Sequence, residues 1–215
     1  MKVGASICRS TRIEGCTYIP LRNTSIENLI QAENQLNNLT KIKTLILFLP
    51  GNTFLRTHNF KDKFGNLHGH KARTRWKDKK VWHEMTKYTN LLKIARAKEA
   101  QKIVLVPFYV RNFDKVCQAT FTKCKEKDLV ERFSMAYAKK MIRISLSSLK
   151  KVVQEVGVEC IAITLREFEK MCTNEQLNGK SKTELIHTIL GDDDVHLRDA
   201  AARNLGRQLT NLIRK

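Results

Sequence analysis

The chain has little proline, no long apolar run and few acidic residues. Only three prolines occur in 215 residues and 42% of the residues are hydrophobic, so the composition excludes a collagen-like or largely disordered chain. No apolar run approaches the ~20 residues needed to span a bilayer, and the N-terminus lacks the long apolar stretch of a secretory signal. We therefore expect a soluble intracellular protein, cytoplasmic or nuclear, without membrane insertion.

The cysteines also lack a recognisable pattern. None forms a CxxC pair, and several lie in apolar stretches where a reduced thiol packs as a small hydrophobe. His68 and His70 are too sparse a pair for a metal site. The sequence therefore predicts no disulfide framework and no metal site, and we expect no cofactor. The six cysteines are Cys8, Cys16, Cys117, Cys124, Cys160 and Cys172.

Positive charge is abundant. The chain has 40 Lys and Arg against 21 Asp and Glu, a formal net charge of +19, and a field of that sign attracts polyanions such as nucleic acid. The same surface could serve only solubility. Charge alone therefore does not decide the function.

Short β-rich runs alternate with longer amphipathic stretches, which is the pattern of a parallel sheet covered by helices. The length favours one domain over residues 1–215, and there is no internal repeat. The expected strands are Met1–Gly4, Tyr18–Leu21, Lys43–Pro50, Lys102–Tyr109, with Pro107 at its exit, and Val158–Thr164. The expected helices are Trp82–Gln101, Asp128–Val156, ending at Gly157, and Arg198–Ile213.

Three groups of residues stand where such a fold places its ligands, outside the carboxyl ends of the strands or before the last helix. Ser6 follows the first strand, and Asn52 follows the strand at 43–50 in a Pro-Gly-Asn-Thr turn. Asp193 precedes His196 by three residues, a spacing at which a carboxylate can orient an imidazole that faces a serine. Taken alone, the serine is also a normal helix N-cap and the Gly-Asn pair a normal turn.

Together these residues resemble the SGNH (GDSL-type) hydrolases. The chain has VGAS at Val3–Ser6 for the family's GDS block, LPGNT at Leu49–Thr53 for its Gly-x-Asn block and DDVHL at Asp193–Leu197 for its DxxH block, in the family's order. The resemblance implies a three-layer α/β/α sandwich with a central parallel sheet, as in flavodoxin-like folds. It also implies an esterase that hydrolyses an acyl ester, such as an acetyl ester, without a metal.

Carried over, the family mechanism makes Ser6 the nucleophile, His196 the general base and Asp193 its orienting acid. The oxyanion hole would combine the backbone N–H groups of Ser6 and Asn23 with the Asn52 side chain. The sequence departs from the family in four ways. Ala5 replaces the GDS aspartate, and Pro50 and Thr53 replace the glycine and the aspartate on the two sides of the third block's asparagine. The second block has no evident glycine.

A basic, aromatic insertion follows Asn52 directly and is expected to be a long loop, at about residues 53–80. It suits an anionic substrate, or RNA or DNA bound by phosphate contacts and base stacking. The second hypothesis is thus a nucleic-acid-binding SGNH-like module with weak catalysis, and a retroelement- or virus-associated esterase domain would combine both functions. The candidate binding residues are Arg56, Lys61, Lys63, Lys71, Arg73, Arg75, Trp76 and Lys77, with Arg203, Arg207, Arg214 and Lys215 of the last helix.

Overall fold

The structure is a computed structural model, and it describes residues 15–21, 25–49, 81–108, 135–173, 188–191 and 196–214, with side chains from residue 142 onward in the fourth segment. These residues form two compact units. The larger unit contains 21, 25–49, 81–108 and 136–162, and the smaller unit contains 15–20, 163–173, 188–191 and 196–214. A single domain over the whole chain stays a prediction.

The larger unit contains a parallel sheet of three strands in the order β1-β2-β3. The strands are β1 (Thr44–Phe48), β2 (Lys102–Val106) and β3 (Glu159–Ala162). In the register of this sheet, Thr44 pairs with Lys102, and Lys102 pairs with Glu159 on its other side. The central strand β2 is fully buried from Ile103 to Val106, as a strand covered on both faces should be. The mixed α/β class and the three apolar strands are therefore confirmed.

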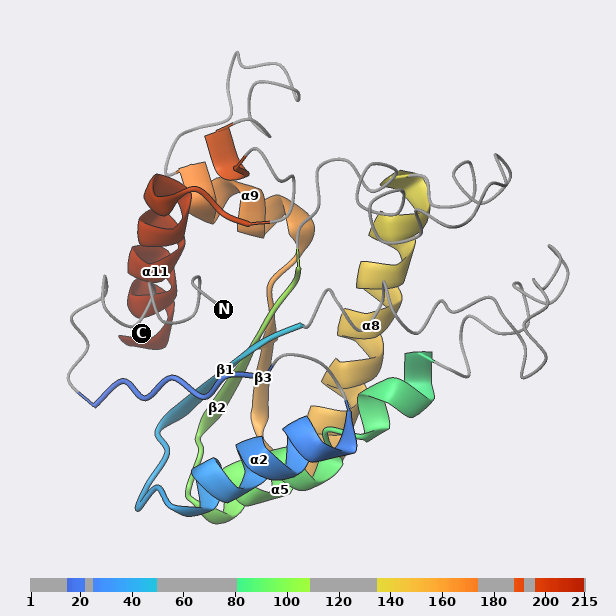
Figure 1. The fold of residues 1–215 in the computed structure, drawn as a ribbon, viewed down its shortest axis with the longest axis vertical. Coiled ribbons are helices and arrows are strands. Elements are labelled where there is room, and N and C mark those ends of the chain that lie inside the picture. The colour runs from blue at the N-terminus through green and yellow to red at the C-terminus, as the bar shows by residue number, and fades with distance from the viewer. Residues whose placement is uncertain are drawn as a thin grey trace, which may run out of the picture. The chain divides into compact units, whose positions relative to one another are not determined.

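Three helices belong to the same unit: α2 (Ile26–Asn37), α5 (Thr89–Ala97) and α8 (Met135–Val156). The connections β1–α5–β2 and β2–α8–β3 both join neighbouring parallel strands in the same direction. Because such crossovers are right-handed, they place α5 and α8 on one face of the sheet. Helix α2 packs beside α5 (Figure 1). The core lies between these helices and the sheet, with Leu92, Leu149 and Val153 fully buried.

Helix α8 ends at Gly157, as the sequence predicts. Gly157 has a φ of +78°, and its N–H donates to the carbonyl oxygen of Gln154 at 2.9 Å. The N–H of Val158 reaches back to the carbonyl oxygen of Val153 at 3.5 Å. These two bonds make a Schellman cap, in which glycine fills the left-handed position with least strain. The cap turns the chain directly into β3.

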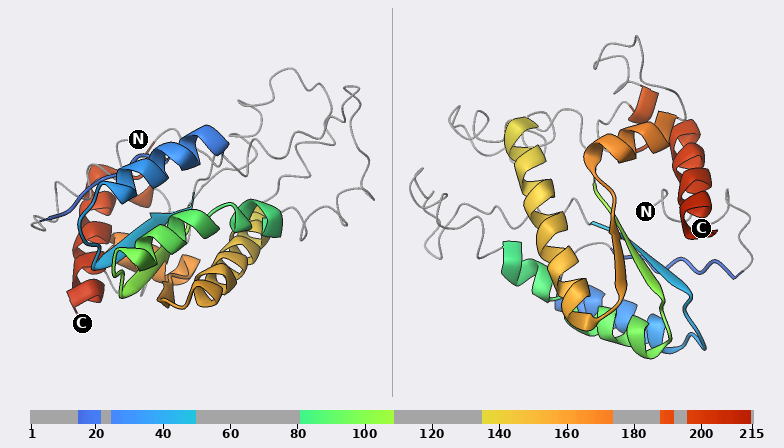
Figure 2. Two further views of the ribbon diagram at one scale, coloured as in Figure 1. Left: turned by 90° about the horizontal axis from the view of Figure 1, so that it is seen from below. Right: turned by 180° about the vertical axis from the view of Figure 1, so that it is seen from behind.

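The smaller unit contains α9 (Leu165–Thr173) and α11 (Asp199–Arg214), which lie side by side (Figures 1 and 2). A capping box starts α9: the Thr164 N–H donates to the Glu167 carboxylate at 2.7 Å, and the Glu167 N–H donates to the Thr164 hydroxyl at 3.2 Å. The Asn204 side-chain amide of α11 donates to the carbonyl oxygen of Cys172 in α9 at 3.0 Å. This bond ties the two helices together.

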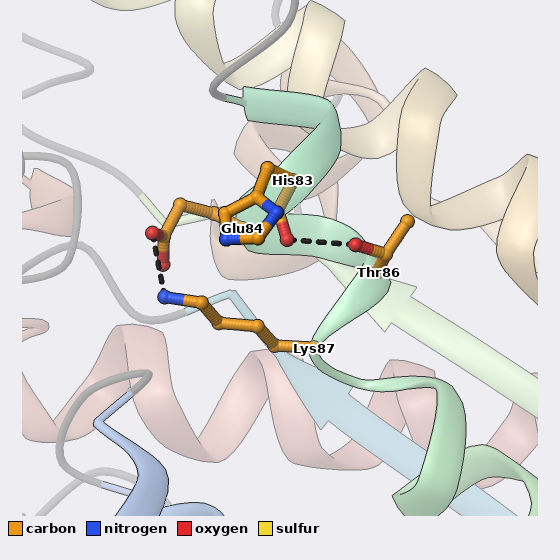
Figure 3. Close-up of polar contacts among 4 residues, drawn as sticks. All are labelled: His83, Glu84, Thr86 and Lys87. Atoms are coloured by element: carbon orange, nitrogen blue, oxygen red, sulfur yellow. Dashed lines mark hydrogen bonds and ion pairs between the residues drawn. The ribbon is translucent and has the colours of Figure 1, made fainter.

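The helix expected over Trp82–Gln101 is interrupted. It is helical at 81–86, turns at residues 87 and 88, and resumes as α5. The hydroxyls of Thr86 and Thr89 donate to the carbonyl oxygens of His83 and Thr86, at 2.8 and 2.6 Å, and Figure 3 shows the first of these bonds. Threonine hydroxyls that bond to carbonyls one turn back compete with the helical ladder and bend it. One continuous helix was therefore a wrong prediction.

Two further predictions are wrong. Residues 16–21, expected to include a strand at Tyr18–Leu21, have no regular secondary structure. Tyr18 is exposed and Pro20 has no N–H to donate, so a ladder would gain little there. Cys16 is in a disulfide bond, so the expectation of reduced thiols fails at this residue. It lies in an exposed stretch rather than an apolar one, whereas Cys160 and Cys172 are free thiols.

The remaining segment predictions fall partly or wholly outside the described residues. The strand at Met1–Gly4 lies outside them, as do residues 128–134 of the expected long helix and the insertion at 53–80. Within the described ranges, no helix is long and apolar enough to cross a membrane.

Candidate active site

Of the predicted catalytic and oxyanion residues, the structure describes only His196. Ser6, Asn23, Asn52 and Asp193 lie outside the described residues. So do the predicted binding residues of the insertion, Arg56, Lys61, Lys63, Lys71, Arg73, Arg75, Trp76 and Lys77. The triad and the oxyanion hole therefore stay predictions, and the local settings of His196 and of the strand before Asn52 can be examined directly.

His196 stands at the end of a short antiparallel pairing. Leu190 and Leu197 form a β-bridge, and the Gly191 N–H donates to the carbonyl oxygen of His196 at 2.8 Å. The backbone N–H of Arg198 donates to the carbonyl oxygen of Ile189 at 2.9 Å. These bonds hold the backbone of residues 189–191 against that of residues 196–198.

The same pairing is anchored in the core, and its second segment leads into α11. Ile189 and Leu190 are fully buried, and the Arg198 side chain donates through Nε to the carbonyl oxygen of Leu190 at 2.9 Å. His196 itself is exposed, and α11 begins three residues later at Asp199. An exposed imidazole on an anchored loop has the accessibility that a general base requires.

The carboxyl end of β1, in the larger unit, is the described segment that precedes Asn52 in the sequence. The Leu49 N–H donates to the carbonyl oxygen of Val106 at 2.9 Å, so the ladder continues one residue beyond the strand. Leu49 is buried, at 3% exposure, which holds the chain against the sheet up to the last residue described in this segment. Asn52 follows three residues later in the sequence. The strand that was expected to carry this asparagine is therefore present.

A buried polar cluster was missed by sequence reasoning. Glu84 is only 6% exposed, and its carboxylate accepts a hydrogen bond from Lys87 Nζ at 2.7 Å (Figure 3). Tyr88 is fully buried, and among the described residues its hydroxyl has no hydrogen-bond partner. Burial, and then the charge of Glu84, raise the pKa of Tyr88. The Glu84–Lys87 spacing signals a helical ion pair in the sequence, but the burial of the carboxylate has no such signal.

The structure also shows where some of the positive charge lies. Arg203, Arg207 and Arg214 of α11 are exposed, whereas Lys215 lies outside the described residues. Residues 203, 207 and 214 follow a helical spacing of four and seven, so they share one face of α11. In the described ranges no group of three or more His, Cys, Asp or Glu residues could hold a metal ion.

Comparisons with known proteins do not identify a relative. No family model, no curated protein and no solved structure matches the chain. The resemblance to the SGNH hydrolases therefore stays a prediction from the sequence motifs.

Proposed function

We propose that the protein is a serine esterase of the SGNH type that hydrolyses a carboxylic ester, such as an acetyl ester. The proposal includes the complete three-layer α/β/α sandwich of that superfamily. It assigns Ser6 as the nucleophile, His196 as the base and Asp193 as the orienting acid. The backbone N–H groups of Ser6 and Asn23 and the Asn52 side chain stabilise the oxyanion.

The observation that supports this proposal is the position of β1 and of His196 next to the two sequence motifs. In the sequence, Pro50-Gly51-Asn52 follows β1, whose carboxyl end belongs to a parallel sheet, and α/β proteins bind their ligands at such ends. His196, the described histidine of the DDVHL motif, is exposed and stands three residues before α11. In the SGNH pattern the asparagine block and the DxxH block stand in these places.

The chemistry follows from these roles. His196 accepts the hydroxyl proton of Ser6 while the serine oxygen attacks the ester carbonyl carbon, and the carbonyl oxygen becomes an oxyanion held by the three donors. His196 then gives the proton to the departing alcohol, which leaves an acyl-serine. Water, deprotonated by His196, attacks this acyl group and releases the acid. Loss of one oxyanion donor typically costs ~3–4 kcal/mol of transition-state stabilisation.

Hydrolysis of p-nitrophenyl acetate and butyrate tests the assignment. Ser6→Ala and His196→Ala should both reduce turnover to background, because each removes a member of the acyl-transfer pair. Matched controls are Ser10→Ala, a neighbouring serine, and His83→Ala, another exposed histidine, and both should keep wild-type turnover. A serine-directed fluorophosphonate should label the wild type at Ser6 and not label Ser6→Ala.

Equal background rates in the wild type and all four variants, with no labelled serine, would refute the esterase. Labelling at a serine other than Ser6 would show that the protein is a hydrolase with a different nucleophile. Circular dichroism of each variant separates loss of chemistry from loss of folding.

A second candidate function is nucleic-acid binding, and the exposed arginines of α11 favour it. Lys and Arg contacts to phosphates release counterions, so binding weakens steeply as salt rises. Arg203→Gln/Arg207→Gln should weaken binding of a fluorescein-labelled RNA hairpin and lower the slope of log K against log salt by about two. Unchanged affinity in this double variant would exclude α11 from the interface.

A further inference from the structure

Helix α8 has a basic surface that neither function above uses. The helix contains five Lys and Arg residues and a single Glu. Arg143, Ser147, Lys150, Lys151 and Gln154 are exposed, and their spacing of three to four residues places them on one face of the helix. We name these five residues the α8 stripe. It contains three cations and two neutral hydrogen-bonding side chains, and the single Glu of the helix, Glu155, is exposed at its edge, four residues after Lys151.

The cations of the α8 stripe form no ion pair with the described residues. Those ion pairs are Lys41–Glu99, Lys87–Glu84 and Lys102–Glu159, and none includes a member of the stripe. Arg143 and Lys150 in particular have no carboxylate within one helical turn on α8, so their charge can attract an external anion. Arg143 and Lys150 are seven residues apart, about 10 Å along the helix at a rise of 1.5 Å per residue.

The opposite face of α8 decides between possible partners. From residue 142 onward, apolar residues such as Ile142, Leu149 and Val153 are buried in the core, and none of the exposed large hydrophobic residues of this part belongs to α8. A helix that binds a lipid surface needs an exposed apolar face to insert. A protein interface normally needs aromatic or aliphatic anchors at its centre. The α8 stripe has only cations and polar groups, which is the composition of a phosphate-binding surface.

We propose that the α8 stripe binds the phosphate backbone of a nucleic acid, with Arg143, Lys150 and Lys151 as the phosphate contacts. A duplex carries one charge per about 1.7 Å of its axis, so several phosphates lie within the length of the stripe. Ser147 and Gln154 lie between and beyond the cations and can donate hydrogen bonds to phosphate or sugar oxygens. Such contacts position a nucleic acid without reading its sequence. The proposal does not depend on esterase activity.

The test is binding of a fluorescein-labelled RNA hairpin, and of a DNA duplex of matched length, by the full chain over a range of salt concentrations. Arg143→Glu/Lys150→Glu should weaken binding at least about tenfold at low salt and lower the salt slope by about two. The matched control is Lys93→Glu/Lys170→Glu, which makes the same change in net charge at two exposed lysines of other helices. The control should lose much less affinity. Arg143→Gln/Lys150→Gln, which adds no negative charge, should show the same lower slope.

Three results would overturn the proposal. Equal loss in the α8 and control variants would show that only net charge matters, and unchanged binding in the α8 variant would exclude the stripe. Loss of sedimentation with phosphatidylserine vesicles, at unchanged RNA and DNA affinity, would assign the surface to lipid. The α11 variant of the preceding section separates the two basic surfaces, and retained turnover in the α8 variant separates this proposal from the esterase.

Discussion

The glycine cap of α8 gives a stability prediction whose size follows from the structure. Gly157 has a φ of +78°, where an L side chain costs about 1–2 kcal/mol. Alanine also restricts the unfolded chain, which returns about 0.4–1 kcal/mol. A Cβ at this position would lie 3.2 Å from Nη1 of Arg96, which donates a hydrogen bond to the carbonyl oxygen of Val156. The Arg96 side chain must therefore shift, and the hydrogen bond weakens.

We expect Gly157→Ala to lower the free energy of unfolding by about 1–2 kcal/mol, which corresponds to a fall in Tm of about 2–8 °C for a chain of this size. Urea unfolding followed by circular dichroism measures it, with an unchanged m-value as the sign that only stability has changed. Gly15→Ala is the matched control, because Gly15 has a φ of +77° but nothing within 4 Å of its Cβ position. In an Arg96→Ala background, Gly157→Ala should cost only the backbone part.

A stability of Gly157→Ala equal to that of the wild type would refute the cap as the reason α8 ends where it does. An identical cost with and without Arg96 would keep the cap but remove the Arg96 contact from the account.

Three further changes test the described core. Tyr88→Phe removes a buried hydroxyl without a described partner and should leave stability equal or raise it by up to about 1 kcal/mol in urea unfolding, whereas a loss would reveal a hydrogen bond. Thr164→Ala removes half of the capping box with Glu167 and should cost about 1 kcal/mol, whereas Thr164→Ser should keep the stability. Burial, and then the charge of Glu169, raise the pKa of Cys172, so iodoacetamide should label it slowly at pH 8 until urea exposes it, as peptide mass mapping can show. Because the folded pKa is the higher one, this thiol adds stability below its unfolded pKa of about 8.5 that is lost as the pH rises above it, and Cys172→Ala should flatten that part of the stability curve.

The strands were the part of the fold that the sequence predicted best. Runs such as the one around Leu45–Phe48 and the one at Ile103–Val106 are apolar on both faces, and only a strand buried on both sides needs that pattern. Their ends were placed one or more residues too far, because residues such as Pro107 are buried without belonging to the strand. Hydrophobic pattern reports burial, and burial extends beyond the paired residues.

Two helices that begin with local caps were missed. Ser25 caps α2 by accepting from the Asn28 amides, and Thr164 caps α9 with Glu167. Both signals are present in the sequence as a capping residue followed three positions later by a polar partner. The break before α5 is different, because the hydrophobic periodicity continues across it. The hydroxyl of Thr89 donates to the carbonyl oxygen of Thr86, and the sequence pattern does not signal this bond.

The sequence predicts where the candidate site residues stand relative to strands and helices, but it does not predict the distances between their side chains. The place of Asn52 after a strand and of His196 before a helix follows from local pattern, and the described elements agree with both. A triad depends on distances between side chains far apart in the sequence, which no local pattern determines. This is why the chemical test must compare Ser6 and His196 variants with nearby residues of the same type.

The distribution of charge shows how a periodic signal can be overlooked beside a denser one. The basic residues of the insertion after Asn52 are crowded in the sequence and therefore easy to notice. Along α8, exposed cations such as Arg143 and Lys150 alternate with buried residues such as Leu146 and Leu149. That alternation is readable at a period of 3.6 residues, since it separates an apolar face from a basic one. Lys41, Lys87 and Lys102 are paired with carboxylates and so contribute little field. The net charge of +19 is therefore unevenly distributed, and the cations most able to act on a partner are those that share a helix face and have no described ion-pair partner.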